Sequence, residues 1–119
     1  MAMLTATRTE TTYIGGRQIK YHPSRTIIID ESIVRLTPTE YRLFLALATN
    51  SKSFSSDTEL ARALPQWAET PAESIDKYVQ NSIKKHIDNL RSKIRPPGLE
   101  IRRIQDYGYI ILEAKMAPQ

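Results

Sequence analysis

Residue types that commonly carry out catalysis are few and scattered in this 119-residue chain. There is no cysteine, which excludes thiol nucleophiles, disulfides and cysteine-ligated metal sites. The two histidines, His22 and His86, fall in different predicted elements and belong to no HExxH motif or metal-ligand cluster. Only four glycines are present, so no glycine-rich loop is available to cradle a phosphate. The sequence therefore predicts a chain that is not an enzyme and that holds no metal or cofactor.

Positive charge is the more informative feature, because it is concentrated in one segment. The whole chain has a formal net charge of +4, whereas residues 76–103 hold eight lysines and arginines against three acidic residues. Lysine and arginine neutralise phosphates, so a local excess of this kind favours a polyanionic partner. The alternative explanation is a lysine-rich helix face that is merely solvated.

A helix is predicted across most of this segment, and its side chains separate into two faces. The apolar positions recur every three or four residues, as on one buried helix face: Ile75, Val79, Ile83, Ile87, Leu90 and Ile94. The opposite face is polar and mostly basic: Lys77, Asn81, Lys84, Lys85, Asp88, Ser92 and Arg95, with Arg91 at its margin. A helix fits the major groove of DNA, where basic side chains bind phosphates and asparagine pairs with an adenine edge.

Three helix starts are indicated by the S/T-x-x-E pattern of a capping box, at residues 37–40, 56–59 and 70–73. These predict a first helix over about 38–48, a second over about 57–64 and a third starting near Pro71. The third helix cannot continue past the Pro-Pro-Gly sequence at 96–98. On the first helix, Tyr41, Phe44, Leu45 and Ala48 are expected to form the buried face.

Short strand-like segments flank the helices on both sides. Alternating or β-branched runs at 13–14, 17–21, 26–29 and 33–36 predict an antiparallel sheet, and 99–105 with 108–113 predict a hairpin. The expected fold class is α+β, a winged helix-turn-helix with an N-terminal sheet, three helices and a hairpin wing. We expect a flexible leader over 1–11, the domain over 12–113 and a C-terminal tail over 114–119.

Three stretches resemble the OmpR/PhoB-type winged-helix family, the effector domains of bacterial two-component response regulators. Residues 36–41, LTPTEY, are similar to the family's L-T-P-x-E-F at the start of its first helix. Residues 81–94, NSIKKHIDNLRSKI, are similar to the recognition-helix pattern R-T-V-D-V-H-I-x-x-L-R-x-K-L. Residues 101–109, IRRIQDYGY, are similar to the wing signature I-R-T-V-R-G-x-G-Y. The resemblance covers roughly residues 12–112.

The resemblance implies a third helix in the major groove of duplex DNA and a wing that reaches toward the minor groove. Family positions that contact bases or phosphates fall on these helix residues: Asn81, His86, Asp88, Asn89 and Arg91. Lys84 and Lys85 join them because of their charge. On the wing, Arg103 falls at a backbone-contacting position, Gln105 falls at the wing-tip arginine position, and Arg102 adds charge beside the helix.

Several positions depart from the family pattern. Gln105 replaces an arginine, Asp106 replaces a turn glycine, and Asp88 and Asn89 stand where arginines are common. We therefore expect a base preference different from that of the better-known members, set mainly by the third helix. Asn81, Lys85 and Asn89 are the expected base readers.

The expected function is sequence-specific binding of double-stranded DNA in bacterial transcriptional regulation, in the cytoplasm. In the family the loop that corresponds to the one around Trp67 can contact RNA polymerase, which makes polymerase a candidate partner here; the alternative is that the extra residues of this segment only lengthen the third helix. We expect a monomer in isolation that dimerises on DNA, and no apolar run is long enough to span a membrane. The alternative is a winged-helix interaction module that binds an acidic protein. A shape-reading RNA binder is disfavoured, because Tyr78 is the only aromatic residue near the charged face.

Overall fold

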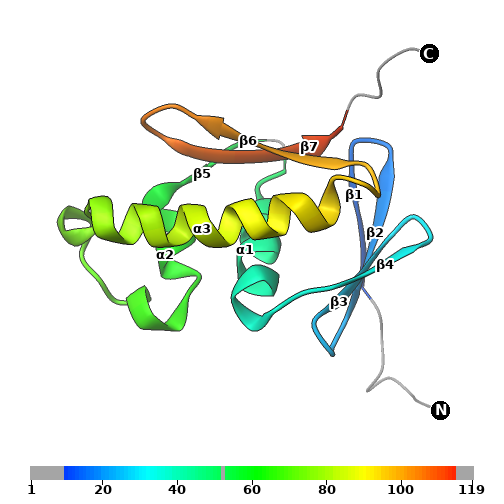
Figure 1. The fold of residues 1–119 in the computed structure, drawn as a ribbon, viewed down its shortest axis with the longest axis horizontal. Coiled ribbons are helices and arrows are strands. Elements are labelled where there is room, and N and C mark those ends of the chain that lie inside the picture. The colour runs from blue at the N-terminus through cyan, green and yellow to red at the C-terminus, as the bar shows by residue number, and fades with distance from the viewer. Residues whose placement is uncertain (1–9, 52, 115–119) are drawn as a thin grey trace.

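The computed structural model describes residues 10–51 and 53–114, which fold into two antiparallel sheets and three α-helices (Figure 1). The elements, in chain order, are β1 (Glu10–Ile14), β2 (Arg17–His22), β3 (Thr26–Ile29), β4 (Ser32–Arg35), α1 (Pro38–Thr49), β5 (Ser55–Ser56), α2 (Asp57–Arg62), the 3₁₀ turns η1 (Pro65–Trp67) and η2 (Ala72–Ser74), α3 (Lys77–Ile94), β6 (Leu99–Ile104) and β7 (Gly108–Glu113). The predicted α+β order of sheet, three helices and hairpin is confirmed.

The first sheet is a meander in which each strand pairs with the next, in the order β1-β2-β3-β4. Its register places Ile19 opposite Ile29 and Tyr21 opposite Ile27, and all four side chains are buried. This follows from the period of two along a strand, which sends alternate side chains to the same face. One face of the sheet therefore closes one end of the core.

The second sheet contains a strand that the sequence did not predict. The short β5 pairs with β7, so that the hairpin becomes a three-stranded sheet in the order β5-β7-β6. Ser56 lies opposite Gly108, and a Cβ built on Gly108 would come within 1.8 Å of the Ser55 carbonyl oxygen. Only glycine allows this approach, and the approach fixes the turn end of the hairpin against the start of α2.

The core lies between α1, α2, α3 and the two sheets. The predicted apolar stripe of α3 is confirmed from Val79 to Ile94, and every one of its positions in the helix is buried. The face predicted for α1 is partly wrong. Leu43, Phe44 and Leu47 are buried there, whereas Leu45 is exposed.

Two of the three predicted capping boxes form. The Thr37 and Ser56 hydroxyls accept hydrogen bonds from the third helical amides. The carboxylates of the glutamates at 40 and 59 in turn accept hydrogen bonds from the backbone amides of the two cap residues. The third box is wrong, because residues 72–74 form only a 3₁₀ turn without a side-chain cap. The third helix begins instead at Lys77, and the Asp76 carboxylate accepts a hydrogen bond from the Val79 amide at 3.1 Å.

The domain boundaries differ slightly from those expected. β1 begins at Glu10, so the last two residues of the predicted leader pair with β2. The rest of that leader and the tail after Ala114 lie outside the described residues. Within the described part of the chain, none of the helices has the length and apolar character needed to cross a bilayer.

Candidate nucleic-acid interface

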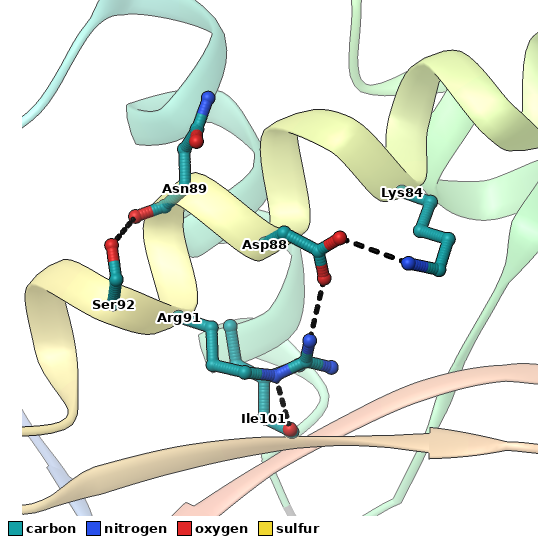
Figure 2. Close-up of polar contacts among 6 residues, drawn as sticks. All are labelled: Lys84, Asp88, Asn89, Arg91, Ser92 and Ile101. Carbon is teal, nitrogen blue, oxygen red and sulfur yellow. Dashed lines mark hydrogen bonds and ion pairs between the residues drawn. The ribbon is translucent and has the colours of Figure 1, made fainter.

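The site is built on α3 and on the β6–β7 hairpin that runs alongside it (Figure 1). One hydrogen bond joins the two directly: the Nε of Arg91 on α3 donates to the carbonyl oxygen of Ile101 on β6 at 3.0 Å (Figure 2). The shallow groove between helix and hairpin has a volume of about 350 Å³. Eight residues line this groove: Lys77, Gln80, Asn81, Lys84, Asp88, Arg91, Arg103 and Tyr109.

Five of the predicted site residues meet in this groove: Asn81, Lys84, Asp88, Arg91 and Arg103. The other two predicted helix residues with exposed side chains, Lys85 and Asn89, are on α3 but do not line it. His86 is half-buried on the same helix. The predicted interface is therefore divided into a groove beside the wing and an outer face of α3.

Asp88 lies at the centre of an ion-pair cluster on the groove side of α3. Its carboxylate accepts hydrogen bonds from Lys84 Nζ at 2.9 Å and from Arg91 Nη1 at 2.6 Å (Figure 2). These pairs follow from helix geometry, because residues three and four apart lie on the same face. The Asn89 side chain points away from this cluster, while its carbonyl accepts a bond from Ser92 (Figure 2).

The wing cations are also held by carboxylates. Arg103 donates to both oxygens of Asp57, at 2.8 and 3.3 Å, and its guanidinium lies 5.0 Å from the centre of the Tyr109 ring. The hydrogen bond to Asp57 raises the pKa of Arg103, and burial raises the pKa of the Tyr109 hydroxyl. Arg103 is thus oriented at the mouth of the groove.

Arg102 forms a fourth ion pair, with Glu100 on the same strand. Its Nε donates to the Glu100 carboxylate at 2.5 Å, and this bond lowers the pKa of that carboxyl. Farther along the hairpin, Gln105 is exposed. Asp106 has a φ of 68°, in the left-handed region. The family's turn glycine is therefore replaced by a residue that must adopt a glycine-like conformation.

Two groups of residues near the wing were missed by sequence reasoning. Asp57 comes beside Arg103 only because β5 pairs with β7, a contact that no local pattern indicates. Phe54 and Tyr107 form a tilted aromatic pair at the wing tip, with ring centres 5.5 Å apart and both side chains exposed. For the aromatic pair, the only indication in the sequence was an aromatic residue, Tyr107, in a predicted turn.

The remaining predicted contact, the loop around Trp67, lies apart from the groove. Trp67 ends the 3₁₀ turn η1, and its side chain packs partly buried against the core. Within the described residues, no cluster of three or more histidine or carboxylate side chains is arranged to hold a metal ion.

The fold and the site define a winged helix-turn-helix domain, with α3 as its exposed helix and β6–β7 as its wing. A family described as "Transcriptional regulatory protein, C terminal" matches residues 30–111, and the chain belongs to this family. The match confirms the resemblance to OmpR/PhoB-type domains and the prediction of a regulatory protein rather than an enzyme.

Solved structures agree on the fold. The C-terminal domain of the nisin resistance regulator NsrR, a lantibiotic response regulator, is 23% identical with a TM-score of 0.66, and the match covers 89% of this chain and 100% of that one. The Klebsiella pneumoniae RstA DNA-binding domain, solved in complex with the RstA box, is 20% identical with a TM-score of 0.63, over 87% and 97% of the two chains. No curated protein matches the sequence significantly.

Proposed function

We propose that this chain is the DNA-binding effector domain of a bacterial transcription regulator and that it reads a specific duplex sequence in the cytoplasm. In the proposed complex α3 lies in the major groove and the β6–β7 wing lies along the neighbouring backbone. Membership of the regulatory family supports this function, as does the likeness to RstA, whose domain was solved with its DNA box.

The observation that carries the proposal is the outer face of α3. Asn81, Lys85 and Asn89 are exposed and are spaced by four residues, so they form one row along the helix, which begins at Asn81 on the edge of the groove and continues on the outer face. The helix has 18 residues and a length of about 27 Å at 1.5 Å per residue, enough to follow the major groove across several base pairs. Asparagine pairs with adenine edges and lysine with guanine edges, which gives this row the chemistry of base readout.

The groove beside the wing supplies the chemistry for backbone contacts. Four cations line its walls: Lys77, Lys84 and Arg91 from α3 and Arg103 from the wing. Phosphate contacts position a protein on the duplex without reading sequence. The two parts of the interface thus correspond to two roles, base readout on the outer face and backbone binding at the groove.

Two further partners belong to the proposal. RNA polymerase is the expected partner of the loop that contains η1 and Trp67. This loop precedes α3 and lies apart from the wing. A second copy of the domain is expected on an adjacent half-site, with the isolated domain a monomer.

Fluorescence anisotropy with labelled DNA tests the proposed function. The domain is expected to bind a mixed-sequence duplex more tightly than either of its single strands, with an affinity that falls as salt rises because counterions are released. Lys85→Ala should weaken duplex binding and flatten the slope of log affinity against log salt, because it removes a cation from the face of α3 that enters the major groove. Lys20→Ala, which removes an exposed lysine from β2 in the other sheet, is the matched control and should leave the slope unchanged. Equal binding of duplex and single strands, or none at low salt, would contradict the proposal.

A further inference from the structure

We propose that the Asp88 carboxylate competes with DNA phosphates for two cations of the interface, Lys84 and Arg91. This competition sets the affinity of the domain for any duplex. This inference rests on the proposed function and adds to it a residue that limits binding. The role expected from the family resemblance was different, since it placed Asp88 among the residues that contact DNA.

Lys84 and Arg91 together form a binding site for an anion, and the Asp88 carboxylate occupies it. Both carboxylate oxygens are used, one by Lys84 and the other by Arg91. Arg91 cannot swing freely, because its Nε is bound to the Ile101 carbonyl of the wing. Its guanidinium is therefore held with Nη1 directed at the Asp88 carboxylate (Figure 2).

The same arrangement recurs on the wing. Glu100 holds Arg102 and Asp57 holds Arg103, so three carboxylates are paired with four of the five basic residues of the predicted interface. Lys85, on the outer face of α3, forms no ion pair with any residue that the structure describes. Ion pairs thus offset part of the positive charge on the backbone-binding side of the domain, and Lys77 is a lining cation that none of these pairs includes.

A phosphate that approaches this side must either displace a carboxylate from its cation or bind close to that carboxylate and be repelled by its negative charge. Either event weakens binding by an amount that depends on charge and not on base sequence, because the competition takes place at the backbone. A single domain then binds weakly to DNA in general. Stable occupancy requires the base contacts of the outer face, a second domain on a neighbouring half-site, or both.

The test compares Asp88→Asn with Glu31→Gln on A·T-only and G·C-only duplexes over a range of salt. Asp88→Asn should tighten binding to both duplexes by the same factor, roughly 1.5- to fivefold, the range of a partly exposed ion pair. It should also steepen the salt slope by about one to two units, one for each freed cation. Glu31→Gln removes the same charge from the exposed β3–β4 turn and should change neither quantity appreciably.

A double-mutant cycle gives a second readout that a general charge effect would not produce. Lys84→Ala should weaken binding more in the Asp88→Asn background than in the natural sequence, because only the freed lysine is fully available to phosphate. Asp57→Asn, which frees Arg103 from the other side of the groove, should reproduce the tighter binding independently. Circular dichroism is expected to show that each variant keeps its helices.

Three results would overturn the inference. One is unchanged or weaker binding by both Asp88→Asn and Asp57→Asn, which would make the carboxylates structural. Another is an effect of Asp88→Asn on only one of the two duplexes, which would make Asp88 a base reader. A third is strict additivity of Lys84→Ala and Asp88→Asn. Failure of the natural domain to bind duplex at all would instead contradict the proposed function, so the two failures are distinguishable.

Discussion

At the scale of single residues, exposure and ion pairing divide the polar side chains of α3 into two groups. The outer row at Asn81, Lys85 and Asn89 is exposed, whereas Lys84 and Arg91 are engaged by Asp88. Neutral amides suit base edges, which present both donors and acceptors, and paired cations suit a backbone that can compete for them. The chemistry of each residue therefore corresponds to its position around the helix.

The wing tip gives a prediction about charge. Gln105 lies where the family has an arginine, so the exposed tip lacks the cation that a narrow minor groove attracts. Gln105→Arg should strengthen DNA binding, most of all for duplexes with an A·T-rich minor groove, and the gain should shrink as salt rises. Anisotropy titrations on A·T-rich and G·C-rich duplexes measure this. Gln105→Glu is the control of opposite sign, and equal affinities for the two variants would contradict the prediction.

Asp106 gives a prediction about backbone conformation. Its φ of 68° is in the left-handed region, where a Cβ is unfavourable and glycine is not. Asp106→Gly should raise the free energy of unfolding by about 0.5–1 kcal/mol in a urea titration. Asp106→Ala removes the same charge but keeps the Cβ, so it should lower stability. Equal stability of the two variants would show that charge, and not backbone strain, decides at this turn.

At this scale the sequence predicts which side chains are exposed but not which ones pair. The helical period placed Asn81, Lys84 and Lys85 correctly on the polar face of α3. The ion pair of Arg103 joins residues 46 positions apart and depends on the β5–β7 pairing. No local pattern contains that information, because tertiary contacts between strands are not periodic in the sequence.

At the scale of elements, one ion pair fixes α3 against α1. The Glu40 carboxylate is 97% buried and accepts hydrogen bonds from the Thr37 amide at 3.0 Å and from Lys93 Nζ at 2.6 Å. The capping-box glutamate therefore serves two purposes, closing the first turn of α1 and binding the last turn of α3. Lys93, which counts toward the basic segment in the sequence, is structural.

Lys93→Ala should therefore destabilise the fold and not the DNA contact. Removing the lysine leaves a buried carboxylate without its cation, at a cost of about 1–2 kcal/mol after allowance for the partly exposed lysine. Chemical denaturation measures the loss. Lys85→Ala is the matched control on the same helix. This variant should keep the full free energy of unfolding but bind DNA more weakly. A stable Lys93→Ala variant with a flattened salt slope would contradict this assignment.

The helix starts show where element prediction succeeds and where it fails. The boxes at Thr37 and Ser56 form because a helix follows each one directly. The box at Thr70 fails because Ile75 leaves helical geometry, with ψ at 84°, and Asp76 provides a new cap. The apolar spacing of four between Ile75 and Val79 is the same in either case, so periodicity could not locate the start of α3.

At the scale of the whole molecule, α3 and the wing lie side by side. The β1–β4 sheet lies near the C-terminal end of α3, where the chain turns into β6 (Figure 1). The described residues have principal extents of 47, 46 and 22 Å, which is a flat shape. Large exposed apolar side chains are distributed among different elements: Tyr13, Ile33, Leu45, Phe54, Tyr78 and Tyr107. Phe54 and Tyr107 form the aromatic pair at the wing tip, and the other four come from separate elements, a pattern that does not indicate the large apolar surface of an obligate dimer.

The domain is therefore expected to be a monomer at low micromolar concentration and to pair only on DNA. Sedimentation velocity should give a single species near 13.6 kDa without DNA. A duplex with two half-sites about one helical turn apart, 10–10.5 base pairs, should bind two copies with positive cooperativity. Moving the half-sites by about half a turn should abolish the cooperativity. A stable dimer without DNA would contradict the prediction.

The central claim is that α3 reads the sequence of duplex DNA, and selection of bound sequences from a random duplex library tests it most directly. The natural domain should enrich one short motif, and Asn81→Ala should enrich a motif that has lost its preference at one position. On the natural motif that variant should lose about 1–3 kcal/mol of binding free energy, with little change on random duplex. Lys20→Ala should select the natural motif unchanged. Enrichment of no motif by the natural domain, or of the same motif by Asn81→Ala, would contradict the claim.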